Sequence, residues 1–200
     1  MYSLKLTKEE QLREDAVQAA QELFQRFGLH KTTMEDIAKA MGRGKSTLYY
    51  YYKSKEEIFN AVIAKEIDEV FACVKKAIDN VSSSEDKLKT YFSVSLKSVK
   101  GKVNLYKIIT GELKENLTQI NLLIRKFNSL EVQSIKEILY KGIENEEFSS
   151  SLEEDVELLA YSAVSAFRSL TLDLAIENKF PNWEERLNIL ISLFIKGMKK

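Results

Sequence analysis

The sequence predicts an all-α fold. Only one of its 200 residues is proline, whereas Leu, Lys, Glu, Ile and Ala recur throughout the chain. A β-rich chain would need turn signals roughly every 8–12 residues, and these are missing. The hydrophobic fraction of 44% argues for a folded chain. The length allows one large domain or two small ones.

The first predicted elements are one long and one short helix. Apolar side chains recur over residues 7–27 at spacings of three and four, as in an amphipathic helix, and Gly28 ends it. A short helix is predicted over residues 32–39. Thr32, with Glu35 three residues later, forms a capping-box pattern at its start.

A glycine turn at Gly42 separates this helix from a third one, predicted over residues 45–51. Leu48 and Tyr52 share the side that would face the preceding helix. Two short helices joined in this way form a helix-turn-helix, whose second helix enters the DNA major groove. The opposite side of that helix carries polar and aromatic residues: Lys45, Ser46, Tyr49, Tyr50 and Lys53.

Positive charge is concentrated in this part of the chain. Residues 31–55 contain six basic and two acidic residues, although the formal net charge of the whole chain is zero. A phosphate-binding surface requires such a local excess. Charge alone fits an ordinary solvated patch equally well.

The rest of the chain is predicted to be helical, with the clearest loop at residues 144–151. We expect the acidic residues of this loop to be solvated, because their spacing fits no calcium-binding pattern. Cys73 is the only cysteine and is expected to be a buried or half-buried apolar residue. The predicted helices cover residues 55–80, 85–100, 103–114, 119–144, 152–178 and 183–199.

The last two predicted helices are apolar on more than one face. A helix that is apolar all round must be buried on all sides. Either both helices lie inside a domain core, or they form a self-associating surface; we favour a homodimer through these two helices.

Several classes of function are disfavoured. One histidine and one cysteine, 43 residues apart, offer no catalytic pair, so neither an enzyme nor a metal site or cofactor is expected. No signal peptide and no apolar run near the roughly 18 residues of a membrane span are visible. The expected location is the cytoplasm, without membrane contact.

Residues 19–55 resemble the DNA-binding domain of TetR-family transcriptional regulators. The resemblance rests on a helix ending in Phe-Gly, the run TTMEDIA, the glycine turn and the run TLYYYYKSK, in that order and spacing. It implies an N-terminal three-helix domain with a helix-turn-helix, placed at residues 1–54. A C-terminal bundle for ligand binding and dimerisation is placed at residues 55–200.

The resemblance also implies phosphate contacts. Thr33, at the start of the first short helix, and Lys55, at the start of the long helix, would each hold a phosphate. Tyr49 and Tyr50 would touch the DNA backbone and thymine methyl groups.

The start of the third helix would read the DNA sequence. Lys45, Ser46 and Thr47 would point at base edges or nearby phosphates. The family usually has Val and a capping residue where this chain has Arg43 and Gly44, so Arg43 is expected to turn outward as an additional DNA contact.

The resulting prediction is a homodimeric repressor that binds a palindromic operator in double-stranded DNA and is released by a small-molecule effector. The alternative is an all-helical protein–protein interaction module that does not bind DNA. Arg168 would face the effector, or would pair with Asp173 or with an acid across the dimer. The predicted pocket residues are Tyr91, Tyr106, Phe127, Phe167 and Arg168.

Overall fold

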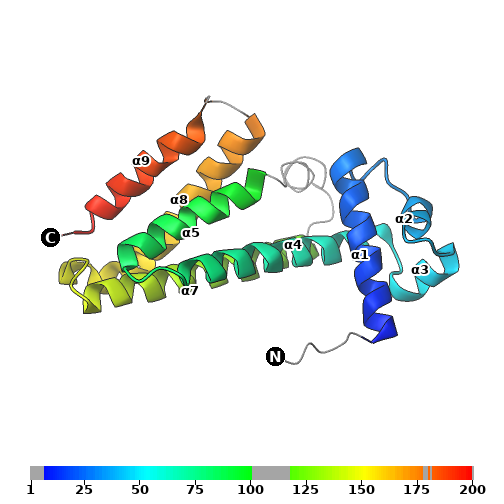
Figure 1. Ribbon diagram of the computed structural model, residues 1–200, viewed down its shortest axis with the longest axis horizontal. Coiled ribbons are helices and arrows are strands. Elements are labelled where there is room, and N and C mark those ends of the chain that lie inside the picture. Colours follow the sequence, from blue (N-terminus) through cyan, green and yellow to red (C-terminus); the bar gives the residue numbers. More distant parts are fainter. Residues whose placement is uncertain (1–6, 101–117, 178–179, 181, 200) are drawn as a thin grey trace.

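A long helix, α4, connects an N-terminal three-helix unit to a C-terminal helical bundle (Figure 1). The computed structural model describes residues 7–100, 118–177, 180 and 182–199, and these form helices and their connections without a strand. The predicted helix over residues 103–114 and Tyr106 lie outside the described residues. The helices are α1 (Lys8–Phe27), α2 (Met34–Ala40), α3 (Lys45–Tyr51), α4 (Lys55–Ile78), α5 (Ser84–Lys100), α7 (Thr118–Glu144), the 3-10 helix η2 (Ser150–Asp155), α8 (Val156–Glu177) and α9 (Trp183–Lys196).

The N-terminal unit has its own core. Phe24 of α1 and Phe59 of α4 meet edge to face, with ring centroids 5.5 Å apart. Ile37 of α2 and Leu48 of α3 are fully buried in the same cluster. The predicted inward face of the third helix is therefore confirmed, and its polar and tyrosine-bearing face is exposed.

The capping box of α2 lies one residue later than the sequence pattern suggested. Thr33 is the N-cap, and its side chain and backbone exchange hydrogen bonds with Asp36. Thr32 is buried instead, and its hydroxyl donates to the Gly28 carbonyl oxygen at 2.8 Å. The Thr32–Glu35 assignment was wrong because this hydrogen bond places Thr32 before the helix.

Helix α4 contributes to both cores. Ile58 and Val62 pack in the N-terminal unit, whereas Val70 and Val74 pack in the bundle. Cys73 is exposed, contrary to expectation, because its neighbour Val74 occupies the position that faces the core.

The loop after α7 does more than connect helices. The Glu147 carboxylate accepts hydrogen bonds from the backbone N–H groups of Ser84, at 3.0 Å, and Glu85, at 3.1 Å. It thereby caps the N-terminus of α5. The sequence did not indicate this role, because Glu147 is far from α5 along the chain. The expectation that this acidic cluster is solvated is thus wrong for Glu147.

Helices α8 and α9 both pack on α5 but keep apolar side chains at the surface. Leu158 and Tyr161 of α8 are 63% and 61% exposed, and Ile189 and Leu193 of α9 are 61% and 59% exposed. Within one chain these helices are not buried on all sides. In the described residues, no helix is both long and apolar enough to cross a membrane.

Candidate nucleic-acid interface

The candidate interface is the outer face of α3 with the start of α2, at one end of the molecule (Figure 1). Of the residues predicted to contact DNA, only Thr47 and Lys55 are half-buried. Tyr50 is 68% exposed and Tyr49 is 37% exposed. The other exposed members are Thr33, Arg43, Lys45 and Ser46.

Glycines determine the turn that presents α3. Gly42 has a φ of 65°, in the left-handed region that side chains disfavour. Gly44 is the N-cap of α3 and provides no side-chain hydrogen bond. Gly44 therefore provides no side-chain cap for the first N–H groups of α3. The helix is held mainly by its packing on the core and by contacts at its C-terminal end.

Two cations cap the C-terminal end of α3. The Lys53 ammonium donates to the carbonyl oxygens of Tyr49, at 3.1 Å, and Tyr50, at 3.3 Å. Arg13 of α1 reaches the Tyr51 carbonyl oxygen at 3.5 Å, and its guanidinium lies over the Tyr51 ring. Positive charge at a helix C-terminus is favourable, so both cations hold the short helix in place.

Lys45 and Glu35 form an ion pair across the helix-turn-helix. The Lys45 ammonium donates to the Glu35 carboxylate and also lies 5.6 Å from the centre of the Tyr49 ring. This hydrogen bond lowers the pKa of Glu35 and raises the pKa of Lys45, so both groups are charged at neutral pH. Sequence reasoning assigned Lys45 to DNA but missed Glu35.

Lys55 has partners within the protein. Its ammonium donates to the carbonyl oxygens of Leu29 and Thr32, in the connector that precedes α2. An ammonium has three donors, so one remains for the predicted phosphate.

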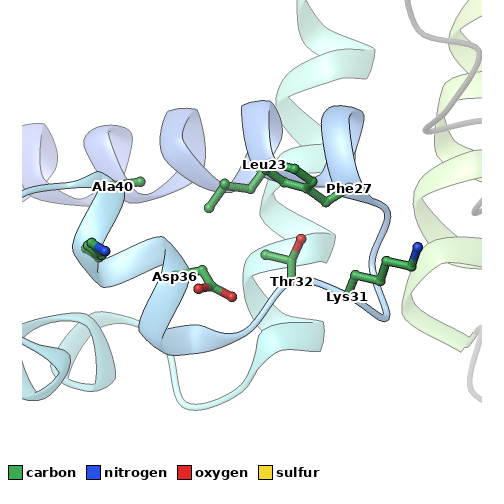
Figure 2. A pocket seen from close by; sticks show the side chains of 7 residues that line it. Leu23, Phe27, Lys31, Thr32, Asp36 and Ala40 are labelled. Atoms are coloured by element: carbon green, nitrogen blue, oxygen red, sulfur yellow. The ribbon is translucent and has the colours of Figure 1, made fainter.

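A separate groove of about 540 Å³ lies between α1 and α2 (Figure 2). None of the residues predicted to contact DNA lines it. Its apolar side chains come from both helices, and its polar rim comes from α2 and the connector. The lining residues are Leu23, Phe27, Lys31, Thr32, Asp36, Lys39 and Ala40.

In the bundle, two predicted pocket residues converge on a third that was not predicted. Glu131 of α7 is buried and accepts hydrogen bonds from the Tyr91 hydroxyl, at 3.1 Å, and from the Arg168 guanidinium. Arg168 thus pairs within its own chain, and Asp173 is exposed. Burial raises the pKa of Glu131, although Arg168 acts in the opposite direction.

Aromatic rings line the same part of the bundle. Phe167 stacks on Phe92 with ring centroids 4.1 Å apart, and Phe194 meets both rings edge to face. Phe127 is half-buried against this core. In the described residues, no group of three or more metal-ligating side chains could hold a metal ion.

Comparison with known proteins agrees with this geometry. Residues 16–62 match the family described as bacterial regulatory proteins, tetR family. The transcriptional repressor KstR2 of Mycolicibacterium smegmatis is 27% identical over 146 residues, which cover 72% of this chain and 71% of that protein. These relationships define a DNA-binding helix-turn-helix regulator.

Solved structures extend the likeness over most of the chain. A transcriptional regulator from Cytophaga hutchinsonii has a TM-score of 0.76 and 27% identity, covering 94% of this chain and 98% of that one. FadR from Bacillus subtilis, in complex with stearoyl-CoA, has a TM-score of 0.74 and 20% identity, covering 92% and 98%. Residues 16–62 thus match the DNA-binding domain of the tetR family, and the chain as a whole has the fold of solved transcriptional regulators.

Proposed function

We propose that this protein is a homodimeric repressor of a palindromic operator that a small-molecule effector releases from DNA. Residues 1–54 read the DNA, and residues 55–200 bind the effector and a second copy. The observation that carries the proposal is the exposed face of α3. Lys45, Ser46 and Tyr50 lie on that face, outside the apolar core that holds the helix in place.

DNA reading is assigned as the sequence implies. Lys45, Ser46 and Thr47 contact base edges or nearby phosphates, and Tyr49 and Tyr50 contact the backbone and thymine methyl groups. Thr33, Arg43 and Lys55 add phosphate or backbone contacts.

Dimerisation through α8 and α9 accounts for their exposed apolar residues. Leu158, Tyr161, Ile189 and Leu193 would otherwise leave a large apolar area in water. A two-fold arrangement would place two α3 helices about 34–36 Å apart, on successive turns of the major groove. The operator would then be a palindrome.

The effector site is assigned to the polar and aromatic centre of the bundle. Tyr91 pairs with Glu131, while Ser84 at the start of α5 pairs with Glu147 after α7, so the two helices run antiparallel. Ser95 and Asn128 therefore lie at about the same level, one turn beyond Tyr91 and Glu131.

The Ser95 hydroxyl and the Asn128 side-chain oxygen are buried without a hydrogen-bond partner among the described residues. Buried polar atoms normally have partners, so these two suit the polar group of a ligand whose apolar body lies on Phe92 and Phe167. The remaining assigned residues are Tyr91, Tyr106, Phe127 and Arg168. Since FadR was solved with stearoyl-CoA, that compound is the first probe.

Release from DNA follows from differential binding. An effector that binds more tightly to the arrangement in which the two α3 helices are misplaced shifts the population away from DNA. Helix α4 connects the two events because it packs in both cores.

Selection from a random pool of DNA duplexes tests the proposal. We expect enrichment of sequences with two inverted half-sites, retained at low salt and lost steeply as salt increases. Enrichment of single half-sites would contradict the dimeric reader, and retention of no duplex would favour the interaction module. Stearoyl-CoA added to the selected complex should release the DNA, and Asn128→Leu should weaken that release.

A further inference from the structure

An ion pair joins Glu35 and Lys45 on the surface that is proposed to approach DNA. Glu35 is the second residue of α2 and Lys45 is the first residue of α3. Their side chains are 55% and 53% exposed. The pair thus places a carboxylate on the same face as the tyrosines and cations assigned to DNA.

Stability does not explain this pair. An ion pair between exposed side chains contributes little, because water and salt screen it. Ile37, Ala38 and Leu48 are buried and already hold α2 against α3. The pair therefore has to be understood through what it does at the DNA surface.

The charge balance of this surface depends on Glu35. Residues 31–55 contain two acids, Glu35 and Asp36. Asp36 is held by the Thr33 hydroxyl and backbone in the capping box of α2. Glu35 is held by Lys45, so the first residue of α3 presents a neutral pair, rather than a bare cation, to a phosphate backbone.

The pair nevertheless suits a base edge. An ammonium has three donors, and Glu35 takes one of them. Two remain for guanine, whose O6 and N7 both accept in the major groove, and the amino group of the paired cytosine can donate to a carboxylate. The donors and acceptor of the pair thus match those of a G·C base pair.

We propose that Glu35 is a specificity-determining residue, which with Lys45 reads a G·C base pair and weakens binding to DNA of unrelated sequence. On unrelated DNA, Lys45 can reach a phosphate only by leaving Glu35, and the carboxylate repels that phosphate. At the operator, both groups find partners on one base pair. The inference rests on the DNA-binding function proposed above.

The test compares the full-length protein with Glu35→Gln on two duplexes, the selected operator and a random-sequence duplex of equal length. One phosphate contact adds about 0.9 to the slope of log affinity against log salt, which is roughly a fivefold effect near physiological salt. We expect Glu35→Gln to bind the random duplex about fivefold more tightly, with a salt slope steeper by about 0.9. The preference for operator over random DNA should fall, and a second selection should show relaxed choice at one G·C position of each half-site.

Two further variants complete the design. Glu22→Gln removes the same charge from an exposed residue of α1. It should change the affinity for either duplex less than Glu35→Gln does, which separates a local effect from an effect of net charge. Lys45→Ala should weaken operator binding, and adding Glu35→Gln to it should restore little specificity. The thermal midpoint of Glu35→Gln should stay near that of the wild type, because the Thr33–Asp36 capping box is intact.

Unchanged random-duplex affinity and unchanged operator preference in Glu35→Gln would overturn the inference while leaving DNA binding in place. A wild-type protein that retains no duplex would overturn both.

Discussion

The Lys55 ammonium donates a hydrogen bond to the Leu29 carbonyl oxygen at 2.8 Å. It also donates to the Thr32 carbonyl oxygen at 3.1 Å. The first residue of α4 therefore holds the connector that leads into α2, and with it the N-cap Thr33. Through this contact the helix that enters the C-terminal bundle also orients the start of the helix-turn-helix.

Lys55→Met should therefore affect both folding and DNA binding. The variant leaves two carbonyl oxygens without their charged donor, and we expect the free energy of unfolding to fall by about 1–3 kcal/mol in urea titrations. If Lys55 also holds a phosphate, the salt slope of operator binding will become shallower by about 0.9. Lys65→Met is the control, since Lys65 donates to the exposed Gln18 side chain. An equal decrease in the free energy of unfolding in both variants would contradict the role of Lys55 in holding the connector.

Gly142 of α7 has no room for a side chain. A Cβ atom there would overlap the Phe148 ring and would lie 3.0 Å from the Ser84 Cβ. Phe148 is fully buried, so the ring cannot move aside without disturbing the core. We expect Gly142→Ala to lower the free energy of unfolding by about 1–3 kcal/mol.

The matched control is Gly197→Ala, at the end of α9. There a Cβ would make only ordinary contacts, at 3.5 Å or more, and φ is −65°. Equal thermal midpoints for the two glycine variants would show that the space around Gly142 is not limiting.

The buried Glu131 should give the stability of this protein a distinctive pH dependence. Its pKa in the folded state is raised by burial, above the ordinary value of 4.5. The folded state thus binds this proton more tightly than the unfolded chain does, so the stabilising effect is complete below pH 4.5 and is lost as the pH rises through the folded-state pKa.

Glu131→Gln removes this titration while keeping an acceptor for Tyr91. We expect the free energy of unfolding of the wild type, relative to that of Glu131→Gln, to decrease between about pH 4.5 and the folded-state pKa in urea titrations. Other ionisable groups are common to both proteins and cancel in the difference. A difference that increases with pH would show that Arg168 dominates and lowers the Glu131 pKa.

Leu193→Arg should separate the proposed dimer. The side chain is 59% exposed on α9, so a charge there is tolerated in one chain but would be buried at the proposed interface. We expect a monomer in analytical ultracentrifugation, and operator affinity lower by about 100-fold because two linked readers become one.

Leu130→Arg is the control for this variant, since Leu130 is 41% exposed on α7, outside the proposed interface. It should remain dimeric and bind DNA normally. A dimeric Leu193→Arg protein would place the interface elsewhere.

The helix-turn-helix could be predicted because its signals are local. The inward positions of Ile37 and Leu48, and the turn at Gly42, follow from spacings of a few residues, and the structure confirms them. The capping box was misplaced by one residue, because Thr32 and Glu35 fit the usual pattern of a capping box, which has Glu or Gln three residues after Ser or Thr. In the structure the Thr32 hydroxyl instead donates to the Gly28 carbonyl oxygen, and Thr33 pairs with Asp36.

The sequence by itself thus determined the all-α class, the faces of α3 and the family resemblance. Tertiary structure alone decided the partners of charged groups: Glu35 with Lys45, Glu131 with Arg168, and Glu147 with the start of α5. The physical reason is that periodicity shows which face of a helix is apolar, but not the level at which two helices meet. That level decides which charges touch, and most of the chemistry proposed for this protein depends on those contacts.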